Sequence, residues 1–270
     1  MMGIRNFNRW QAFGGHLSFS LLLGLAVFAL VRWVWYPDAL FELGGAGKLM
    51  ALVVGIDVVL GPLLTLIVFN PRKRSLIWDL AVILALQIGA LGYGVWVMAQ
   101  SRPVFLVAVV DRYELVAANE IHPDDLAKAS RPEWRSLSWT GPIVVGAQAS
   151  ENPEERMAQA MDAMQGGPDL PQLPKYFVPI EGLVGPLASR ARALGEFDLV
   201  APGKVAELRA WLTRQGLKED GVAVLPLKAR LGMGAVLIDR RTARPLRTAG
   251  FDGYAATDAA GGDANVPLGH

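Results

Sequence analysis

Three long apolar stretches in the first hundred residues constrain the fold more than any other feature of this chain. They run from Leu17 to Trp35, from Leu49 to Phe69 and from Leu76 to Met98, and each contains a single charged residue. A helix needs roughly 20 mostly apolar residues to cross a bilayer, and each stretch meets that length. The sequence therefore predicts three membrane-spanning helices. A cleaved signal peptide is the alternative for the first stretch, but its apolar run is too long and no small-x-small cleavage site follows it.

Basic residues near the ends of these stretches predict the orientation. The turn between the second and third stretches contains Arg72, Lys73 and Arg74, and Arg5 and Arg9 precede the first stretch. The loop between the first two stretches has one basic residue, and so does the end of the third. We therefore expect the N-terminus and the short turn in the cytoplasm, and everything after the third stretch in the periplasm.

The remainder of the chain has the composition of a water-soluble domain, with 19 of the 26 basic and 21 of the 25 acidic residues. Apolar runs at 104–110 and 141–148 predict strands, and 222–230 with 235–241 predicts a β-hairpin. Helices are expected at 183–194, and from residues 153 and 202 onward, because each of the latter two begins at a proline and ends near a glycine. The proline-rich stretch 167–182 predicts an extended ordered loop.

These patterns together predict a membrane protein with three transmembrane α-helices followed by a small α+β periplasmic domain. The expected divisions are a cytoplasmic segment at 1–16, the three-helix membrane domain at 17–100 and the periplasmic domain at 101–254. The tail 255–270 is rich in Ala, Gly, Asp and Asn, and we expect it to be disordered.

Polar side chains inside the apolar stretches are costly in a membrane and therefore informative. Asp57 and Gln87 lie at similar depths in the second and third stretches, so they could form a hydrogen bond in an antiparallel helical hairpin. Asp57 then has either a structural role, paired with Gln87 or a backbone carbonyl, or a functional one, in contact with a partner helix or in proton transfer. Asp79 and Thr65 also match in depth, which predicts a second contact between these helices.

Small residues and a proline interrupt the second and third stretches. Gly61-Pro62 should weaken and bend the second helix. In the third, Ala85, Gly89 and Gly92 recur at three-to-four spacing, and such faces allow close approach of another helix. The neighbour is either a helix of this chain or a transmembrane helix of another protein.

Catalysis has little support in the sequence. It contains no cysteine, no nucleophile elbow, no P-loop and no paired-carboxylate signature, so we expect no enzymatic activity, no metal site and no cofactor. His122 beside Asp124 and Asp125 is more typical of a helix start than of a metal site. A net charge of +1 gives no reason to expect nucleic-acid binding. Four arginines between 240 and 247 could contact an acidic partner or lipid headgroups, or form a solvated edge.

Several segments, read together, resemble the type IV pilin accessory proteins of the TfpX/TfpZ kind. The most specific is Ile56-Asp57-Val58-Val59-Leu60-Gly61-Pro62-Leu63-Leu64-Thr65. The other matching segments are Ala12-Phe13 with His16-Leu17 and Ser20, Trp35-Tyr36-Pro37, Phe69-Asn70-Pro71, Asp79-Leu80-Ala81-Val82, Gln87 with Ala90-Leu91 and Tyr93-Gly94, Arg102-Pro103, Asp111-Arg112, Gly166-Gly167-Pro168-Asp169-Leu170 and Pro174-x-Tyr176.

This resemblance implies a bacterial inner-membrane protein that assists type IV pilus assembly, as a pilin-specific chaperone or as a modulator of assembly or retraction. Its expected partners are the major pilin, the pilus assembly machinery and membrane lipid. The candidate residues in the membrane, for binding a partner or for structure, are His16, Asp57, Gly61, Pro62, Thr65, Asp79, Gln87 and Gly89. The candidate periplasmic contacts are Gly167, Pro168, Asp169 and Tyr176.

Two other functional classes remain open at the level of sequence. A membrane-anchored periplasmic sensor or ligand-binding module would need a separate transducer, because the predicted cytoplasmic parts are very short. A small transporter or proton-conducting subunit would need more ionisable groups inside the membrane than three spans provide here, unless the chain oligomerises.

Overall fold

The three apolar stretches form three long helices, as predicted. The computed structural model describes residues 8–255. Helix α1 spans Arg9–Ala29 and continues as a π-helical segment, Leu30–Trp35, while α3 spans Ala46–Val68 and α4 spans Leu76–Gln100. All three are long and apolar enough to cross a membrane. Of the predicted end segments, residues 1–7 and 256–270 lie outside the described residues.

Helix α1 begins eight residues before the apolar run that predicted it. Asn8 caps its first turn, because the Asn8 side chain accepts a hydrogen bond from the backbone of Gln11 while the Gln11 side chain accepts one from the backbone of Asn8. The sequence-based boundary followed hydropathy alone, whereas the cap determines where the helix starts. The segment 9–16 is therefore helical.

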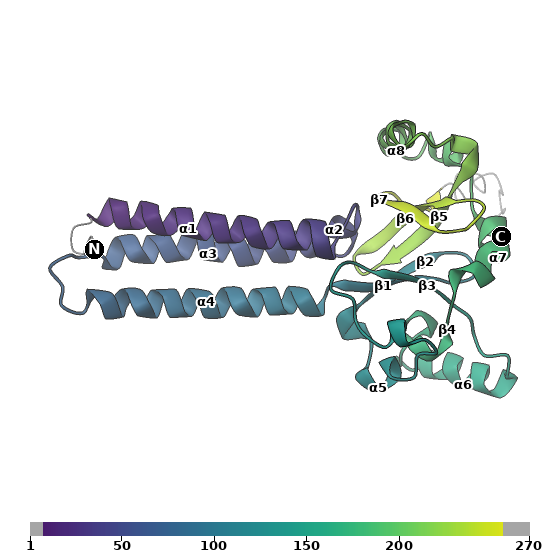
Figure 1. The fold of residues 1–270 in the computed structure, drawn as a ribbon, viewed down its shortest axis with the longest axis horizontal. Helices are drawn as coiled ribbons and strands as arrows, with labels where there is room; N and C mark the ends of the chain where they lie inside the picture. Colours follow the sequence, from purple (N-terminus) through teal and green to yellow (C-terminus); the bar gives the residue numbers. More distant parts are fainter. Residues whose placement is uncertain (1–7, 256–270) are drawn as a thin grey trace, which may run out of the picture.

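Helix α3 is the central element of the membrane domain and packs against both α1 and α4 (Figure 1). Two glycines permit this close packing. A Cβ at Gly24 of α1 would lie 2.8 Å from Val54 Cγ1, and one at Gly94 of α4 would lie 2.5 Å from Val53 Cγ2. A short helix, α2 (Leu40–Leu43), lies in the loop between α1 and α3.

A seven-stranded mixed sheet forms the centre of the second domain, with strand order β4-β3-β1-β2-β5-β6-β7. The bounds are β1 Pro103–Ala108, β2 Tyr113–Ala117, β3 Ile143–Ala147, β4 Phe177–Val178, β5 Val222–Ala229, β6 Gly232–Asp239 and β7 Pro245–Ala249. The β1–β3 and β2–β5 pairs are parallel and the others antiparallel. The predicted strands at β1, β3, β5 and β6 are confirmed, and β2, β4 and β7 are additional.

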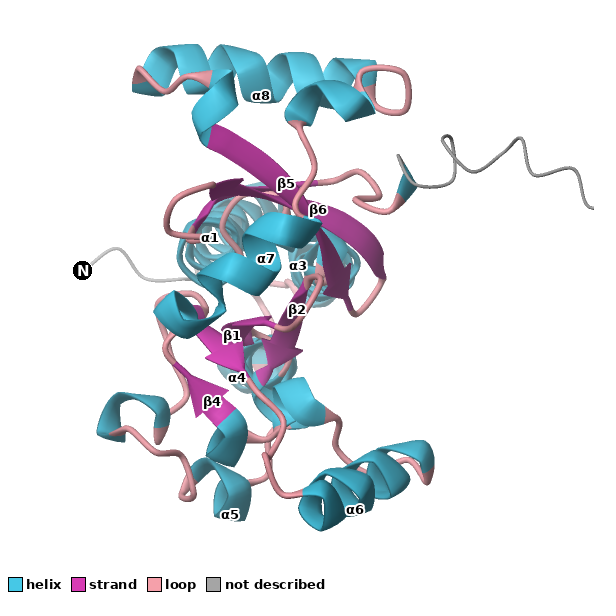
Figure 2. Ribbon diagram, turned by 90° about the vertical axis from the view of Figure 1, so that its right-hand side faces the viewer, coloured by secondary structure: helices cyan, strands magenta, loops and turns pink. Residues whose placement is uncertain are grey.

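Helices surround this sheet on several sides. Figure 2 shows α7 in front of the middle of the sheet, α8 at one end, and α5 and α6 at the other. Their bounds are α5 Pro123–Leu126, α6 Pro153–Met164, α7 Val184–Arg190 and α8 Pro202–Gln215. The sequence predicted each of them, although α7 is shorter than expected. Short 3-10 turns at Leu170–Gln172, Pro174–Tyr176 and Ile180–Leu183 order the proline-rich stretch.

Side chains alternate along each strand, so every strand contributes to both faces of the sheet. Both faces are buried because other elements pack against them. In β5, Val222 and Val224 pack against α8, whereas Ala223, Leu225 and Leu227 face the opposite way. This second face packs directly against the ends of the membrane helices. The residues that the helices contribute to that shared core are Val31, Trp35, Tyr36, Leu40, Ala46, Met50 and Met98. One continuous hydrophobic core therefore joins the two domains.

Arg102 holds the junction where α4 becomes β1. Its side chain is 3% exposed, and its guanidinium lies 3.7 Å from the centroid of the Trp139 ring. It donates to the backbone carbonyls of Ser138 (2.8 Å) and Ala99 (2.5 Å). Nearby, the Tyr36 hydroxyl donates to the Ser101 carbonyl (2.7 Å). These bonds connect the C-terminal end of α4 to the segment that contains Ser138 and to the loop after α1.

We expect Arg102→Ala to lower the free energy of unfolding by about 2–3 kcal/mol, because it removes the hydrogen bonds to the Ser138 and Ala99 carbonyls and the contact with Trp139. Thermal unfolding of the purified protein in detergent measures this loss. The matched control is Arg214→Ala, which removes an exposed arginine from α8. Equal stability of the two variants would contradict the role of Arg102.

Candidate functional site

A groove of about 390 Å³ runs along α3 and α4 within the membrane domain. Its walls are apolar except for Asp57 from α3, Gln87 from α4 and the hydroxyl of Tyr93. Leu60, Leu86 and Ala90 are among the wall residues that face outward, toward the lipid in a membrane. The groove therefore presents an apolar surface with a polar centre.

The structure contains the predicted hydrogen bond between these two polar residues. Gln87 Nε2 donates to Asp57 Oδ1 and to the Asp57 backbone carbonyl, at 3.1 Å in both cases. Asp57 is 7% exposed. Gln87 Oε1 is buried and has no hydrogen-bond partner among the described residues. Within the described residues, the pair therefore retains one polar atom without a partner, Gln87 Oε1. An unpaired buried acceptor is costly in an apolar environment.

Gly61 makes room for this hydrogen bond. A Cβ on Gly61 would lie 1.8 Å from Gln87 Nε2, so any side chain at this position would displace the amide. Pro62 follows directly and is also buried. It has no N–H to donate to the preceding turn, yet α3 continues through it as a single helix. The bend predicted from Gly61-Pro62 stays a prediction.

The predicted contact between Asp79 and Thr65 is wrong. Thr65 Oγ1 lies 2.6 Å from Nδ1 of His16 in α1, and Asp79 Oδ2 lies 2.6 Å from Lys73 Nζ. Thr65 and Asp79 were matched by their depth in the membrane, but they do not lie on the facing sides of α3 and α4. Thr65 is eight residues from Asp57, which rotates it by about 80° around α3, toward α1. Asp79 meets Lys73 because both lie at the turn that joins α3 and α4.

Gly89, another candidate residue of the membrane domain, does not line the groove with Asp57 and Gln87. Gly89 follows Gln87 by two residues, which rotates it by about 200° on α4. It is exposed, and a Cβ there would meet nothing within 4 Å. Ala85 and Gly92 are exposed as well. The small residues of α4 that line the groove are Ala90 and Gly94 instead.

A second hollow of about 440 Å³ lies around the His16–Thr65 contact. Its lining comes from α1, α3 and α4, and Phe19, Phe69 and Leu84 make it largely apolar. It forms near the turn between α3 and α4. Five of the eight candidate membrane residues therefore lie at two sites: Asp57, Gly61 and Gln87 in the groove, and His16 with Thr65 in this hollow. Pro62, Asp79 and Gly89 line neither of them.

The four candidate residues in the α+β domain do not form one surface. Gly167 and Pro168 line an open hollow of about 460 Å³ together with His122. Asp169 caps a 3-10 turn through the backbone N–H of Leu170. Tyr176 is buried, and its hydroxyl donates to Glu155 Oε1 (2.8 Å).

Glu155 is the centre of a polar cluster that the sequence did not predict. Hydrogen bonds from Ser150, Tyr176 and Lys175 lower the pKa of Glu155 to about 2. The carboxylate therefore remains charged at neutral pH and fixes the start of α6 to the turn that contains Tyr176. This contact orders the loop, and it assigns Tyr176 a structural role.

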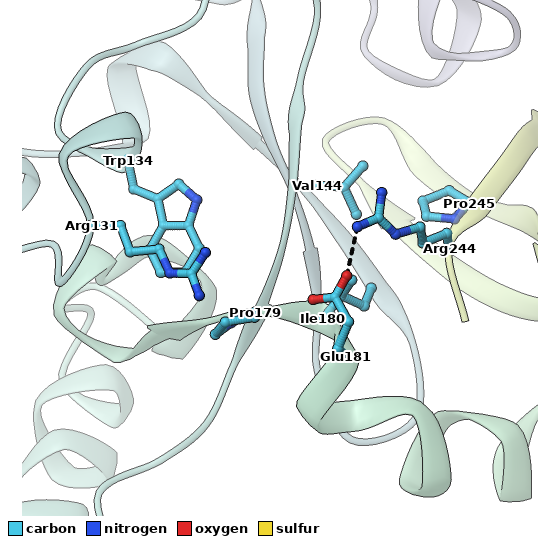
Figure 3. Close-up of a pocket in the computed structure, with 8 residues that line it drawn as sticks. All are labelled: Arg131, Trp134, Val144, Pro179, Ile180, Glu181, Arg244 and Pro245. Carbon is cyan, nitrogen blue, oxygen red and sulfur yellow. Dashed lines mark hydrogen bonds and ion pairs between the residues drawn. The ribbon is translucent and has the colours of Figure 1, made fainter. Parts of the chain in front are cut away.

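A further cavity of about 250 Å³ lies between β3 and the start of β7 (Figure 3). Arg244 Nη2 and Glu181 Oε1 approach to 2.6 Å on one side of it, and Arg131 stacks over Trp134 on the other. The ion pair with Arg244 lowers the pKa of Glu181. The predicted cluster of four arginines is therefore divided, since Arg240 donates to the Val222 carbonyl instead. Within residues 8–255, no group of three or more His, Cys, Asp or Glu side chains could hold a metal ion.

We expect Gly61→Val to destabilise the membrane domain by about 1–2 kcal/mol, because it displaces the Gln87 amide and removes the hydrogen bond between α3 and α4. Unfolding of the purified protein by titration with a denaturing detergent measures this. Gly89→Val is the matched control, since it makes the same change where space is open. Equal stability of the two variants would show that the Asp57–Gln87 bond does not stabilise the hairpin.

Comparisons with known proteins agree with the resemblance carried by the membrane segments. No family model and no solved structure matches this chain. Two relatives are the fimbrial assembly proteins of serogroups E1 and I of Dichelobacter nodosus, with 30% and 31% identity over 228 residues. Each alignment covers 83% of this chain and 88% of the relative. The shorter fimbrial assembly protein of serogroups C1 and C2 is 36% identical over 118 residues, which cover 43% of this chain and 90% of that protein. The chain belongs to the family of these fimbrial assembly proteins, a family of type IV pilus accessory proteins.

Proposed function

We propose that this protein assists type IV pilus assembly from the bacterial inner membrane, as a pilin-specific chaperone or as a modulator of assembly or retraction. The observation that carries this proposal is the family relationship, because two relatives named fimbrial assembly proteins align over 88% of their length. The proposed role is not enzymatic. The membrane domain offers a groove, which suits the binding of a partner rather than catalysis.

The proposed orientation places the turn between α3 and α4 in the cytoplasm and the α+β domain in the periplasm. Arg72, Lys73 and Arg74 in that turn support it, because cytoplasmic loops carry the excess of basic residues. A pilin subunit with one apolar helix in the same membrane and a globular head in the periplasm could then contact both domains.

In the membrane, the proposed binding site for the pilin helix is the groove between α3 and α4. Its outward-facing apolar side chains, Leu60, Leu86 and Ala90, offer a surface to a helix. Hydrogen bonds between helices contribute modestly to association in lipid, by about 0.6–2 kcal/mol each, so packing along the groove must supply most of the affinity.

In the periplasm, the proposed contact with the pilin head is the hollow lined by Gly167, Pro168 and His122. Its lining comes from the segment that leads into α5 and from the residues that follow α6, in the part of the α+β domain where Figure 1 labels these two helices. Asp169 and Tyr176 order the adjacent turns and support this surface without forming part of the hollow.

Ala90→Trp would fill the groove without touching the Asp57–Gln87 bond directly, so we expect it to reduce surface pili while the protein stays in the membrane. The measurement is sheared surface pilin, compared with the amount of this protein in the membrane fraction. Ala85→Trp is the matched control, because Ala85 is exposed but lies outside the groove. Equal piliation in the two variants would rule out the groove as the binding site.

Deletion of the gene tests the functional proposal as a whole. We expect less surface pilin, and the total cellular pilin distinguishes the roles. Unchanged total pilin indicates assembly or retraction, which a second deletion of the retraction motor separates, whereas a parallel fall indicates a chaperone that protects the subunit. No change in either quantity would contradict a role in pilus assembly.

A further inference from the structure

The tip of the β5–β6 hairpin lies against the end of the membrane helices. The backbone N–H of Leu231, in the turn of the hairpin, donates to the Leu43 carbonyl (3.2 Å). A Cβ on Gly45 would lie 2.8 Å from Leu231 Cδ1. Gly45 immediately precedes α3, so the hairpin tip is level with the first turn of this membrane-spanning helix.

The length of α3 places this tip at the membrane surface. Its 23 residues span about 35 Å, whereas the hydrocarbon core of a bilayer is about 30 Å thick. The first turn of α3 therefore lies where acyl chains meet headgroups. A segment in contact with Gly45 lies at the same boundary.

The side chains at the tip match this boundary. Leu231 and Met233 are 55% and 44% exposed, although both are apolar. Arg230 beside them is exposed and forms no ion pair within residues 8–255. Arg32 at the end of α1 and Lys48 in the first turn of α3 are likewise free of ion pairs in that range. Lys228, on β5 close to the tip, does have a carboxylate partner, because its Nζ lies 3.1 Å from Glu114 Oε2.

Acidic side chains of the same region point elsewhere. Asp38 lies 4.0 Å from Arg247 Nε, and the Glu42 carboxylate lies beside Gly250. Neither residue forms an ion pair with Arg230, Arg32 or Lys48. The surface around the tip therefore combines exposed apolar side chains with unpaired positive charge, a combination that suits a phospholipid headgroup layer.

We propose that Arg230, Leu231 and Met233 form a lipid-binding tip on the α+β domain. Leu231 and Met233 insert among the acyl chains next to α3, and Arg230 binds lipid phosphate together with Arg32 and Lys48. The tip adds a second contact with the bilayer, besides the membrane helices, and fixes the orientation of the α+β domain relative to the membrane. This inference does not depend on the role in pilus assembly.

Site-specific fluorescence in proteoliposomes tests the proposal. The full-length protein contains no cysteine, so Met233→Cys can be labelled alone with an environment-sensitive fluorophore. The liposomes contain phosphatidylethanolamine and phosphatidylglycerol, with a nitroxide quencher attached near the headgroup. Trp96→Cys in α4 is the reference for a membrane position. Leu199→Cys, which is 95% exposed just before α8, is the reference for an aqueous one.

We expect the label at position 233 to show blue-shifted emission and to be quenched to about the extent seen at position 96. Adding Arg230→Glu to the same labelled protein should reduce that quenching. Water-like emission at 233, without quenching, as expected at 199, would overturn the proposal. Quenching at 233 that Arg230→Glu leaves unchanged would overturn the assigned role of Arg230 in binding lipid phosphate.

Discussion

The hydrogen bond between Asp57 and Gln87 sets the arrangement of the membrane domain. Lipid offers no hydrogen-bond partner, so a carboxyl group inside a span must find one within the protein. Gln87 supplies it from α4, at 3.1 Å, and Gly61 leaves the space in which its amide lies. The same contact fixes the register of the α3–α4 hairpin and leaves a groove beside it with one unused acceptor. A structural bond and a candidate binding surface therefore coincide.

The second determinant of the architecture is the core shared by the membrane helices and the sheet. Trp35, Tyr36 and Met98 from the helices pack together with Leu225 and Leu227 of β5, and Arg102 fixes the chain as it passes from α4 into β1. A hinge between the domains is therefore unfavourable, because opening it would expose this core to water. The groove in the membrane and the hollow at Gly167 are held at a fixed separation. For a protein that receives a membrane helix and a globular head of the same subunit, this rigidity would determine how the subunit is presented.

Sequence alone predicted the parts of this structure that depend on hydropathy and on depth. The three spans followed from apolar length, and the Asp57–Gln87 bond from matched depth in antiparallel helices. Depth does not specify which face a residue occupies, which explains the wrong contact predicted for Thr65 and the position of Gly89 outside the groove. The contacts of Arg102 with Ser138 and of Leu231 with Leu43 join segments far apart in the sequence, so no local sequence pattern predicts them. Tyr176 was found through the family resemblance, but its structural role emerged only from its contact with Glu155.

The central claim is that a pilin helix binds in the groove between α3 and α4, and crosslinking in living cells tests it most directly. A photoreactive amino acid at Leu60 faces the groove, whereas one at Ala85 lies outside it at a similar depth in the membrane. The account predicts an adduct with pilin from position 60 and none from position 85. No adduct from position 60, or equal adducts from both positions, would contradict it.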